Sequence, residues 1–322
     1  MTADGWLLVE TLTEDLDPAL VADAGRIREW VAPSRWSRAI GPARAKLLLD
    51  AVRRGESARV GDTVVVVEPV RCALGGVHGS QVWIGPADRP VPPPRHVGAW
   101  DWDARTELAH HGPGLEELIF AREPGAVRVV RTPPEAFGRM VRFDGRVDYF
   151  AMASTLEPGG RWQGEVDVLG DDDRVRRFQM VARARPGLGR VSGLMHAVPE
   201  RGGDTVDLDV AMLRAVSKGV GVGAGLILLS GAVIYEWVAD PPPPLDRWTV
   251  ERPVIDAADL AALRAACVEL TQAPDTTRQL TLRVRFADGE WVRAHAELAT
   301  ITTAATGHGL LRVRPSVEGE AG

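Results

Sequence analysis

Residues 165–183, EVDVLGDDDRVRRFQMVAR, decide the fold class of this chain. Two apolar-rich stretches, Gln163–Leu169 and Val175–Ala184, flank the residues Gly170-Asp171-Asp172-Asp173. Glycine and aspartate tolerate the backbone angles of a tight reversal, so these residues predict a turn. Two strands joined by such a turn pair with each other in antiparallel fashion. The middle of the chain is therefore expected to contain an antiparallel hairpin.

The elements around this hairpin extend it into a module. A strand over His96–Asp103 contains Trp100-Asp101-Trp102-Asp103, whose alternation with period two places both tryptophans on one strand face. A helix is predicted over Val147–Leu156, before the hairpin, and a closing strand over Gly189–Val198. Helices covering one face of a mainly antiparallel sheet would bury the apolar side of each of these elements.

The last third of the chain repeats this order of elements. It predicts a hairpin, a helix, a second hairpin and a closing strand, over Gly225–Leu229 with Ala232–Val238, Ala257–Leu270, Gln279–Phe286 with Glu290–Ala299, and Gly309–Val313. The uncharged run from Gly219 to Tyr235 is shorter than the roughly 20 residues of a bilayer span, and Ser230-Gly231 divides it. A transmembrane helix is therefore not expected there.

The first third is a shorter version of the same pattern. Strands are predicted over Trp6–Thr11, Val64–Val67 and Ser80–Ile84, with a leucine-rich helix over Ala43–Arg53. The proline run Pro90 to Pro94 predicts an extended linker, because proline excludes helix. The run Pro241 to Pro244 predicts a stiff loop inside the last module. The expected domains are residues 1–90, 95–200 and 205–316.

These stretches resemble sensor modules. The GAWDWD strand (98–103) with residues 165–183 looks like a PAS domain, and so does RVRFADGEWVRAHAEL (283–298) with its preceding helix. The WLLVETL segment (6–12) resembles a GAF- or PAS-like domain. The whole chain is similar to actinobacterial, mycobacterial-type triple sensor-domain proteins, whose modules follow one another without an effector domain. The resemblance implies an α+β fold of three tandem PAS/GAF-like modules, each an antiparallel sheet flanked by helices, with a pocket between sheet and helices.

Composition narrows the possible functions. The net charge of −6 and the sequence pI near 5.7 argue against a nucleic-acid-binding surface, which needs clustered basic residues. Cys72 and Cys267 lie far apart in sequence, so a reducing compartment is expected and no disulfide framework is predicted. The N-terminus carries acid where a signal peptide carries Lys or Arg, which favours a cytoplasmic location.

Apparent motifs have plainer interpretations. Gly219, Gly221 and Ala224 match GxGxxA but follow a predicted helix over Leu208–Ser217, the reverse of the strand-then-helix order of a dinucleotide site. The adjacent His110 and His111 point apart. The acidic run Asp171 to Asp173 lacks the spacing of a calcium loop. Cys267 is expected to pack in the core, and Cys72 to end a strand.

The other histidines occur singly, and none has a ligand spacing; they are His78, His96, His196, His295 and His308. No catalytic residue, metal site or cofactor is therefore assigned, and no effector domain is expected after Val313. The chain has ten tryptophans. Large amphipathic rings serve recognition in pockets and can equally fill small cores. The candidate pocket residues are Trp100, Trp102, Trp162, Trp237 and Trp291.

The resulting expectation is a non-catalytic, cytoplasmic signal-sensing or scaffold protein. It would bind an unknown small molecule or a signalling protein and act through a separate effector, with Asp209–Ser217 as a helix that could support a homodimer. Two alternatives stay open. One is an enzyme, a hydrolase or an isomerase, with an unmarked active site. The other is a structural adaptor whose pockets are filled by its own side chains.

Overall fold

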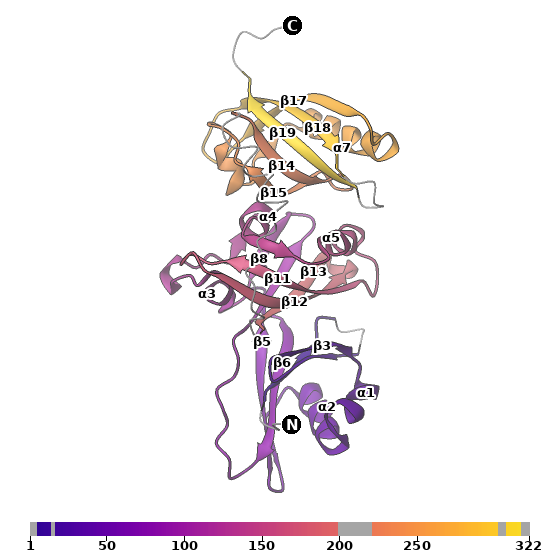
Figure 1. The fold of residues 1–322 in the computed structure, drawn as a ribbon, viewed down its shortest axis with the longest axis vertical. Helices are drawn as coiled ribbons and strands as arrows, with labels where there is room; N and C mark the ends of the chain where they lie inside the picture. Colours follow the sequence, from indigo (N-terminus) through magenta and orange to yellow (C-terminus); the bar gives the residue numbers. More distant parts are fainter. Residues whose placement is uncertain (1–4, 14–16, 199–220, 302–306, 317–322) are drawn as a thin grey trace. The chain divides into compact units, whose positions relative to one another are not determined.

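The structure is a computed structural model, and it describes residues 5–13, 17–198, 221–301 and 307–316. Three sheets follow one another along the chain, and each is accompanied by helices (Figure 1). The strands pair antiparallel, as in β1–β6, β13–β7 and β14–β19. The predicted α+β class is confirmed: the chain consists of three tandem antiparallel sheets with few helices.

The N-terminal sheet has six strands in the order β3-β2-β1-β6-β5-β4. Its elements are β1 (Leu7–Glu10), β2 (Ala19–Asp23), β3 (Arg26–Val31), α1 (Pro33–Ile40), α2 (Pro42–Arg54), β4 (Ala58–Val60), β5 (Thr63–Arg71) and β6 (Val77–Pro86). Both helices begin with proline at the first turn, where its missing N–H has no helical partner to lose. Trp36 and Leu48 on these helices pack against Val65 and Val82 of the sheet.

The middle sheet has seven strands in the order β10-β11-β12-β13-β7-β8-β9. Its strands and helices are β7 (Val97–Asp103), β8 (Leu108–His111), α3 (Leu115–Phe120), β9 (Val130–Arg131), α4 (Pro133–Phe137), β10 (Met140–Phe143), α5 (Arg146–Thr155), β11 (Arg161–Leu169), β12 (Val175–Arg185) and β13 (Arg190–Ala197). Short 3-10 turns lie at Pro124–Ala126 and Pro186–Leu188. The predicted β11–β12 hairpin is confirmed, with its turn at residues 170–174.

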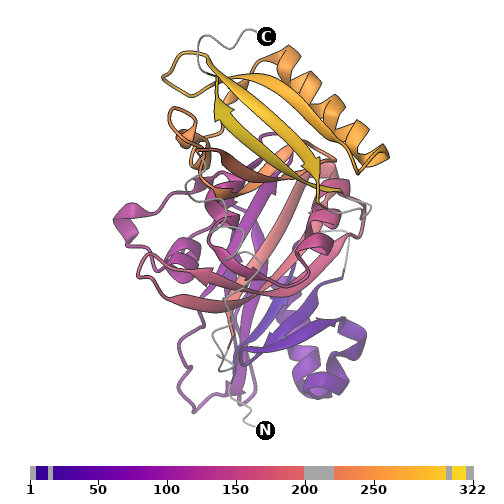
Figure 2. The same cartoon turned by 45° about the horizontal axis from the view of Figure 1, so that its top comes forward.

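The C-terminal sheet has six strands in the order β15-β14-β19-β18-β17-β16. Its elements are β14 (Gly223–Leu228), β15 (Val233–Ala239), a 3-10 turn (Asp246–Thr249), β16 (Val254–Ile255), α7 (Ala257–Gln272), β17 (Thr277–Arg285), β18 (Val292–Thr300) and β19 (His308–Pro315). Helix α7 lies against β17 and β18 (Figure 2). The helix predicted over Leu208–Ser217 lies outside the described residues. Among the helices that are described, none combines the length and apolar character needed to cross a membrane.

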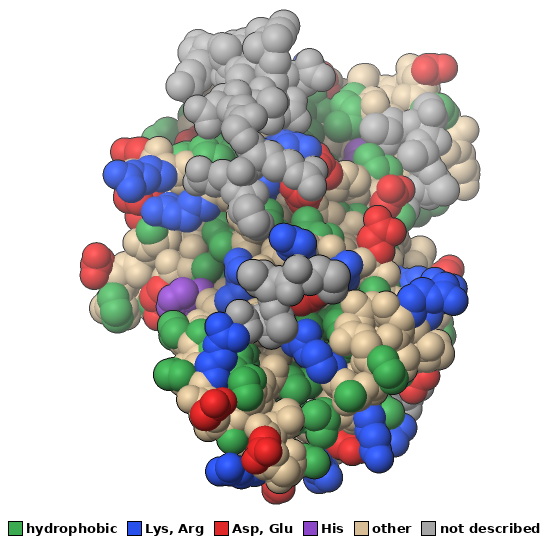
Figure 3. Space-filling view, turned by 60° about the horizontal axis from the view of Figure 1, so that its bottom comes forward, with side chains coloured by type: hydrophobic (Ala, Val, Ile, Leu, Met, Phe, Trp, Pro, Cys, Tyr) green, Lys and Arg blue, Asp and Glu red, His purple; other side chains and the backbone are tan. Residues whose placement is uncertain are grey.

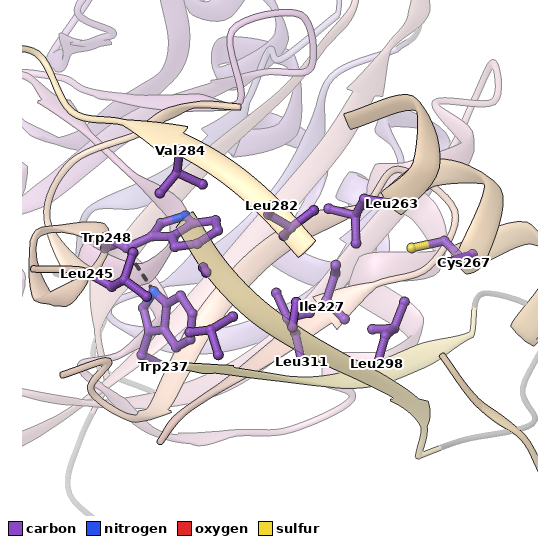
Figure 4. Packing of buried hydrophobic residues seen from close by; sticks show 14 of the residues in the cluster. Ile227, Trp237, Leu245, Trp248, Leu263, Cys267, Leu282, Val284, Leu298 and Leu311 are labelled. Carbon is purple, nitrogen blue, oxygen red and sulfur yellow. Dashed lines mark hydrogen bonds between the residues drawn. The ribbon is translucent and has the colours of Figure 1, made fainter. Parts of the chain in front are cut away.

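Side chains fill the space between α7 and the C-terminal sheet (Figure 4). Leu263, Cys267 and Leu270 lie on the buried face of α7, because residues three or four positions apart share one face of a helix. At the other end of this core the rings of Trp237 and Trp248 lie 5.6 Å apart, and the Trp237 indole N–H donates to the Trp248 carbonyl at 3.2 Å.

All three sheets place their first strand in the interior. The first strand lies between the second and the last, giving β2-β1-β6, β8-β7-β13 and β15-β14-β19. The repeat that the sequence predicts is therefore present, with one difference. Two or three strands precede the helices in every module, whereas the sequence pattern predicts one strand in the first two modules. Strand β8 was not predicted, because its four residues, LAHH, show little alternation of apolar and polar side chains.

The chain divides into two compact units. Within the described residues, the first holds 5–130, 143–145 and 156–198, and the second holds 131–142, 146–155 and 221–316. Helices α4 and α5 thus group with the C-terminal sheet. In this second unit the Phe150 ring lies 4.2 Å from that of Tyr235, and Arg146 forms a 2.6 Å ion pair with Glu236.

Candidate functional site

The N-terminal sheet and most of the middle sheet share a core inside the first unit. One buried cluster contains Leu8 and Val70 from the N-terminal strands together with Val181 and Leu194 from the middle strands. The backbones approach closely as well. A Cβ added at Gly79 would lie 2.8 Å from Leu194 Cδ1, a separation that real Cβ atoms do not show. The two modules are therefore joined by packing as well as by the segment 87–96.

Polar side chains lie inside this contact. Cys72 follows β5, His78 lies on β6 and Asp101 lies on β7, and their exposed fractions are 5%, 1% and 1%. Their sulfur, nitrogen and oxygen atoms all lie within 4.8 Å of one another. Buried groups of this kind are uncommon unless they are paired. The group is therefore the first candidate for a functional site.

The β5–β6 hairpin brings Cys72 and His78 together. The Cys72 N–H donates to the Gly76 carbonyl at 2.9 Å, which closes the turn. The strand register then shifts, because Val70 pairs with Gly79 and Arg71 pairs with Val77, so that His78 is an extra residue on β6. A β-bulge of this kind re-aims the side chain of the extra residue.

Asp101 accepts two hydrogen bonds on one oxygen, and the Cys72 thiol also donates to its carboxylate. His78 Nε2 lies 2.8 Å from Asp101 Oδ1, and the Ser192 hydroxyl donates to the same atom at 2.5 Å. Ser192 is held there because it pairs with Asp101 across β13 and β7. The other ring nitrogen, His78 Nδ1, is buried without a hydrogen-bond partner in the described chain, and the other carboxylate oxygen, Asp101 Oδ2, has none besides the Cys72 thiol.

The environment sets the charge states. Burial alone would raise the pKa of Asp101, but the hydrogen bond and charge of His78 and the hydrogen bond of Ser192 lower that pKa below its ordinary value. Burial, reinforced by the Asp101 charge, raises the pKa of the Cys72 thiol. Asp101 is thus ionised at neutral pH while Cys72 stays protonated. A protonated thiol is a poor nucleophile.

A buried ion pair lies in the same contact. Arg183 on β12 binds Glu10 on β1 through contacts of 2.5 and 3.1 Å, and their side chains are 6% and 1% exposed. Glu10 also accepts from the Leu12 N–H at 3.1 Å. The Arg183 guanidinium lies 4.6 Å from the centre of the Trp30 ring. Trp30 has φ of +44°, a left-handed conformation that is unusual for a bulky residue and indicates local strain.

The predicted pocket tryptophans do not come together in one site. Trp100 and Trp102 lie on β7, buried and half-buried, and Trp162 lies buried on β11 with its N–H donating to the Gly145 carbonyl at 3.1 Å. Trp237 is part of the C-terminal core, and Trp291 is exposed beneath Arg285. Their role in ligand binding stays a prediction.

Two open hollows, of about 600 and 300 Å³, lie on the surface of the described chain, one in each unit. The larger is bordered by His96, Glu117 and Phe178, together with Arg177, which binds Asp167 at 2.8 Å. The smaller lies on the C-terminal sheet beside His295. No tryptophan is among the residues that border either hollow, and neither reaches Cys72, His78 or Asp101.

Several smaller predictions can be compared with the structure. His111 is buried with Nδ1 3.1 Å from Glu116, while His110 points to the other side of β8, so the two point apart as expected. Asp171 and Asp172 lie in the exposed β11–β12 turn, where Arg122 and Arg176 bind them.

Sequence reasoning missed the buried group altogether. Cys72 looked like a strand-end residue and His78 like an isolated histidine, yet both flank the turn-forming pair Gly75-Gly76, which was the available signal. Asp101 looked like the polar side of an alternating strand. It is buried because the N-terminal sheet covers that side, and the sequence of the middle module alone does not show this.

Fold and site together define a class: an α+β chain of three tandem antiparallel sheets, two of which share a core with a buried polar group. Residues 5–93 match the family described as Rv3651-like, N-terminal. The crystal structure of an uncharacterized protein from Mycobacterium tuberculosis is similar over 98% of this chain and 97% of that chain, with a TM-score of 0.79 and 22% identity. The expected likeness to a mycobacterial protein is thus confirmed for the fold.

Two other solved structures are more distant. A sensory box histidine kinase/response regulator from Burkholderia thailandensis is 20% identical over 37% of this chain and 86% of that chain, with a TM-score of 0.26. An RNA-binding light-oxygen-voltage receptor is 13% identical over 68% of this chain and 95% of that chain, with a TM-score of 0.27. At these TM-scores neither protein informs the function of this chain. No curated protein matches it.

Proposed function

We propose that this chain is a non-catalytic, cytoplasmic signal-sensing protein. Its PAS/GAF-like modules bind a small molecule or a protein partner, and a separate effector carries the signal onward. The observation that supports this role is the buried group of Cys72, His78 and Asp101 in the core shared by two modules. A ligand bound there would act directly on the packing of one module against the other.

The buried atoms His78 Nδ1 and Asp101 Oδ2 set the size of the coupling between ligand binding and module packing. A buried polar atom without a partner costs about 1–3 kcal/mol. A ligand that satisfies His78 Nδ1 or Asp101 Oδ2 in one arrangement of the modules would favour that arrangement by a similar amount. That is a shift of about 5- to 150-fold in the ratio of two states, the range typical of coupling between sites.

The contacts of the group support binding over nucleophilic catalysis. The Ser192 hydroxyl donates to the Asp101 carboxylate instead of to a histidine base. The Cys72 thiol lies beside a carboxylate, which opposes formation of a thiolate. Nucleophilic enzymes need the opposite arrangement, with a base beside the hydroxyl or a cation beside the thiol.

The surface supports a protein or small-molecule partner over nucleic acid. Cationic and anionic side chains are interspersed on the face drawn in Figure 3, and the chain as a whole has a net charge of −6. Nucleic-acid-binding faces instead gather Lys and Arg in one patch.

The second candidate function is a structural adaptor. The observation in its favour is that the C-terminal core is filled by the side chains of its own module. Leu263 and Leu282 in this core are at most 1% exposed. An adaptor would bind a protein partner strongly and would show no response to small molecules.

Native mass spectrometry of the full chain, purified from its own host, separates these functions. We expect a bound mass that disappears on denaturation and that Asp101→Asn reduces, with no turnover across a panel of hydrolase and isomerase substrates. Turnover that Cys72→Ser or Ser192→Ala abolishes would show an enzyme instead. A bare polypeptide that copurifies with a protein partner would favour the adaptor.

A further inference from the structure

We infer that Cys72, His78 and Asp101 bind one divalent transition-metal ion, with zinc as the preferred metal. This inference rests on the proposed function, since it names the ligand of the buried group. Thiolate, imidazole and carboxylate are the three side chains that zinc binds in proteins. Each of the three residues offers one such atom, and these atoms lie within 4.8 Å of one another.

Binding one ion would require the three side chains to rotate, because their present separations are those of hydrogen-bonded groups. Zinc binds sulfur at about 2.3 Å and nitrogen or oxygen at about 2.0–2.2 Å, which places neighbouring ligand atoms about 3.3–3.8 Å apart. His78 Nε2 and Asp101 Oδ1 are 2.8 Å apart, and the whole group spans no more than 4.8 Å. The three backbone positions therefore need not move far.

The hydrogen bonds show what the group lacks. The donors in it approach the Asp101 carboxylate: the Ser192 O–H and the His78 ring lie at Oδ1, and the Cys72 thiol is a third donor. Within the described chain, His78 Nδ1 has no hydrogen-bond partner and Asp101 Oδ2 has none besides the Cys72 thiol, although both residues are only 1% exposed. Loss of the Cys72 proton would turn this thiol from a donor into an acceptor, and acceptors gathered in a buried place are suited to a cation.

Charge selects a divalent ion. With Asp101 ionised and Cys72 as thiolate, a neutral His78 leaves two negative charges, which one divalent ion cancels. The neighbouring charges, Glu10 and Arg183, already neutralise each other. Calcium and magnesium prefer oxygen ligands, whereas sulfur and imidazole favour zinc and similar transition metals.

Proton release follows from the same contacts. Cys72 is protonated in the metal-free protein, so binding forms a metal–sulfur bond and breaks the S–H bond, releasing one proton to solvent. Ser192 would keep its hydrogen bond to Asp101 and orient that carboxylate, as residues next to metal ligands commonly do.

The test uses the full chain, treated with a chelator and then titrated with Zn²⁺ or Co²⁺. We expect one equivalent of metal per chain by elemental analysis, and for Co²⁺ a thiolate-to-metal charge-transfer absorption. Cys72→Ser should abolish that absorption, and His78→Gln and Asp101→Asn should weaken binding on the order of tenfold or more. Cys267→Ser is the matched control, because Cys267 is an equally buried cysteine in the C-terminal core, and it should leave binding unchanged.

Variants that fail to fold would be recognised by circular dichroism, and the wild-type titration then decides alone. Absence of stoichiometric metal from the wild-type protein would overturn the inference, and so would an absorption band that persists in Cys72→Ser. If native mass spectrometry instead detects an organic ligand whose binding depends on Asp101, the metal inference is refuted and the proposed sensing function is kept. If metal binds without changing hydrogen exchange in β6 or β7, the metal site is supported and the proposed sensing function is refuted.

Discussion

Replacing Arg183 with methionine removes the cation from the buried ion pair with Glu10 and leaves the apolar stem of the side chain in place. Glu10 would keep one hydrogen bond, from the Leu12 N–H, and would lose three contacts with the guanidinium of 2.5 to 3.1 Å. Breaking a buried pair from one side costs about 3–5 kcal/mol, because the remaining charge has no counterion.

The double variant Glu10→Leu/Arg183→Met tests the physical cause. Removing both charges leaves only the Leu12 N–H without its acceptor, at a cost of about 1–3 kcal/mol. We therefore expect the double variant to be more stable than Arg183→Met. The control is Asp23→Asn, which breaks the Asp23–Arg28 pair of the same unit. Those side chains are 23% and 35% exposed, so the free energy of unfolding should fall by about 1 kcal/mol or less.

The assay is hydrogen exchange in increasing urea, followed on peptides from β1 and β12. Site-resolved exchange is needed because a chain with two compact units need not unfold in one step. Equal losses of stability in Arg183→Met and Asp23→Asn would refute the idea that the unpaired buried charge is the cause. A double variant less stable than Arg183→Met would refute it as well. Either result would mean that the two sheets of the first unit are not held by this pair.

Leu263→Ala should destabilise the C-terminal core by about 2–5 kcal/mol in urea unfolding, whereas Val268→Ala on the same helix, 55% exposed, should change stability little. Asp256→Ala should cost about 0.5–2 kcal/mol, because its side chain accepts from the Ala258 N–H at the start of α7. Burial lowers the pKa of His196 from 6.5 to about 4. The unfolded chain then binds more protons between these values, so stability is full above pH 6.5 and falls toward pH 4. His196→Gln should flatten that part of a pH titration of unfolding, and an unchanged slope would contradict the assignment.

Most of the sheet architecture follows from local pattern. The β11–β12 and β17–β18 hairpins were predictable because apolar alternation and a turn sequence coincide within about 20 residues. Helix α7 was predictable because Leu263, Cys267 and Leu270 recur at helical spacing and Asp256 caps its start. Strands β2 and β3 were missed, since they lie between β1 and the helices without a strong turn signal of their own.

The candidate site was not predictable, because it belongs to no single module. Asp101 sits on a strand whose alternation correctly predicts two faces, but the pattern cannot say that a second sheet covers the acidic one. The partners of Asp101 come from positions 23 residues before it and 91 residues after it. Local periodicity carries no information over such separations, whereas packing between modules does.

The interior position of the first strand has a consequence for synthesis on the ribosome. Strand β7 emerges long before β13, its neighbour in the finished sheet, since Asp101 and Ser192 are 91 residues apart. When β7 emerges, the complete N-terminal sheet, which ends at Pro86, has already left the ribosome. The nascent chain thus carries a finished N-terminal sheet whose Leu8 and Val70 still lack Val181 and Leu194. A growing chain in this state offers an apolar surface to chaperones until β13 has been translated.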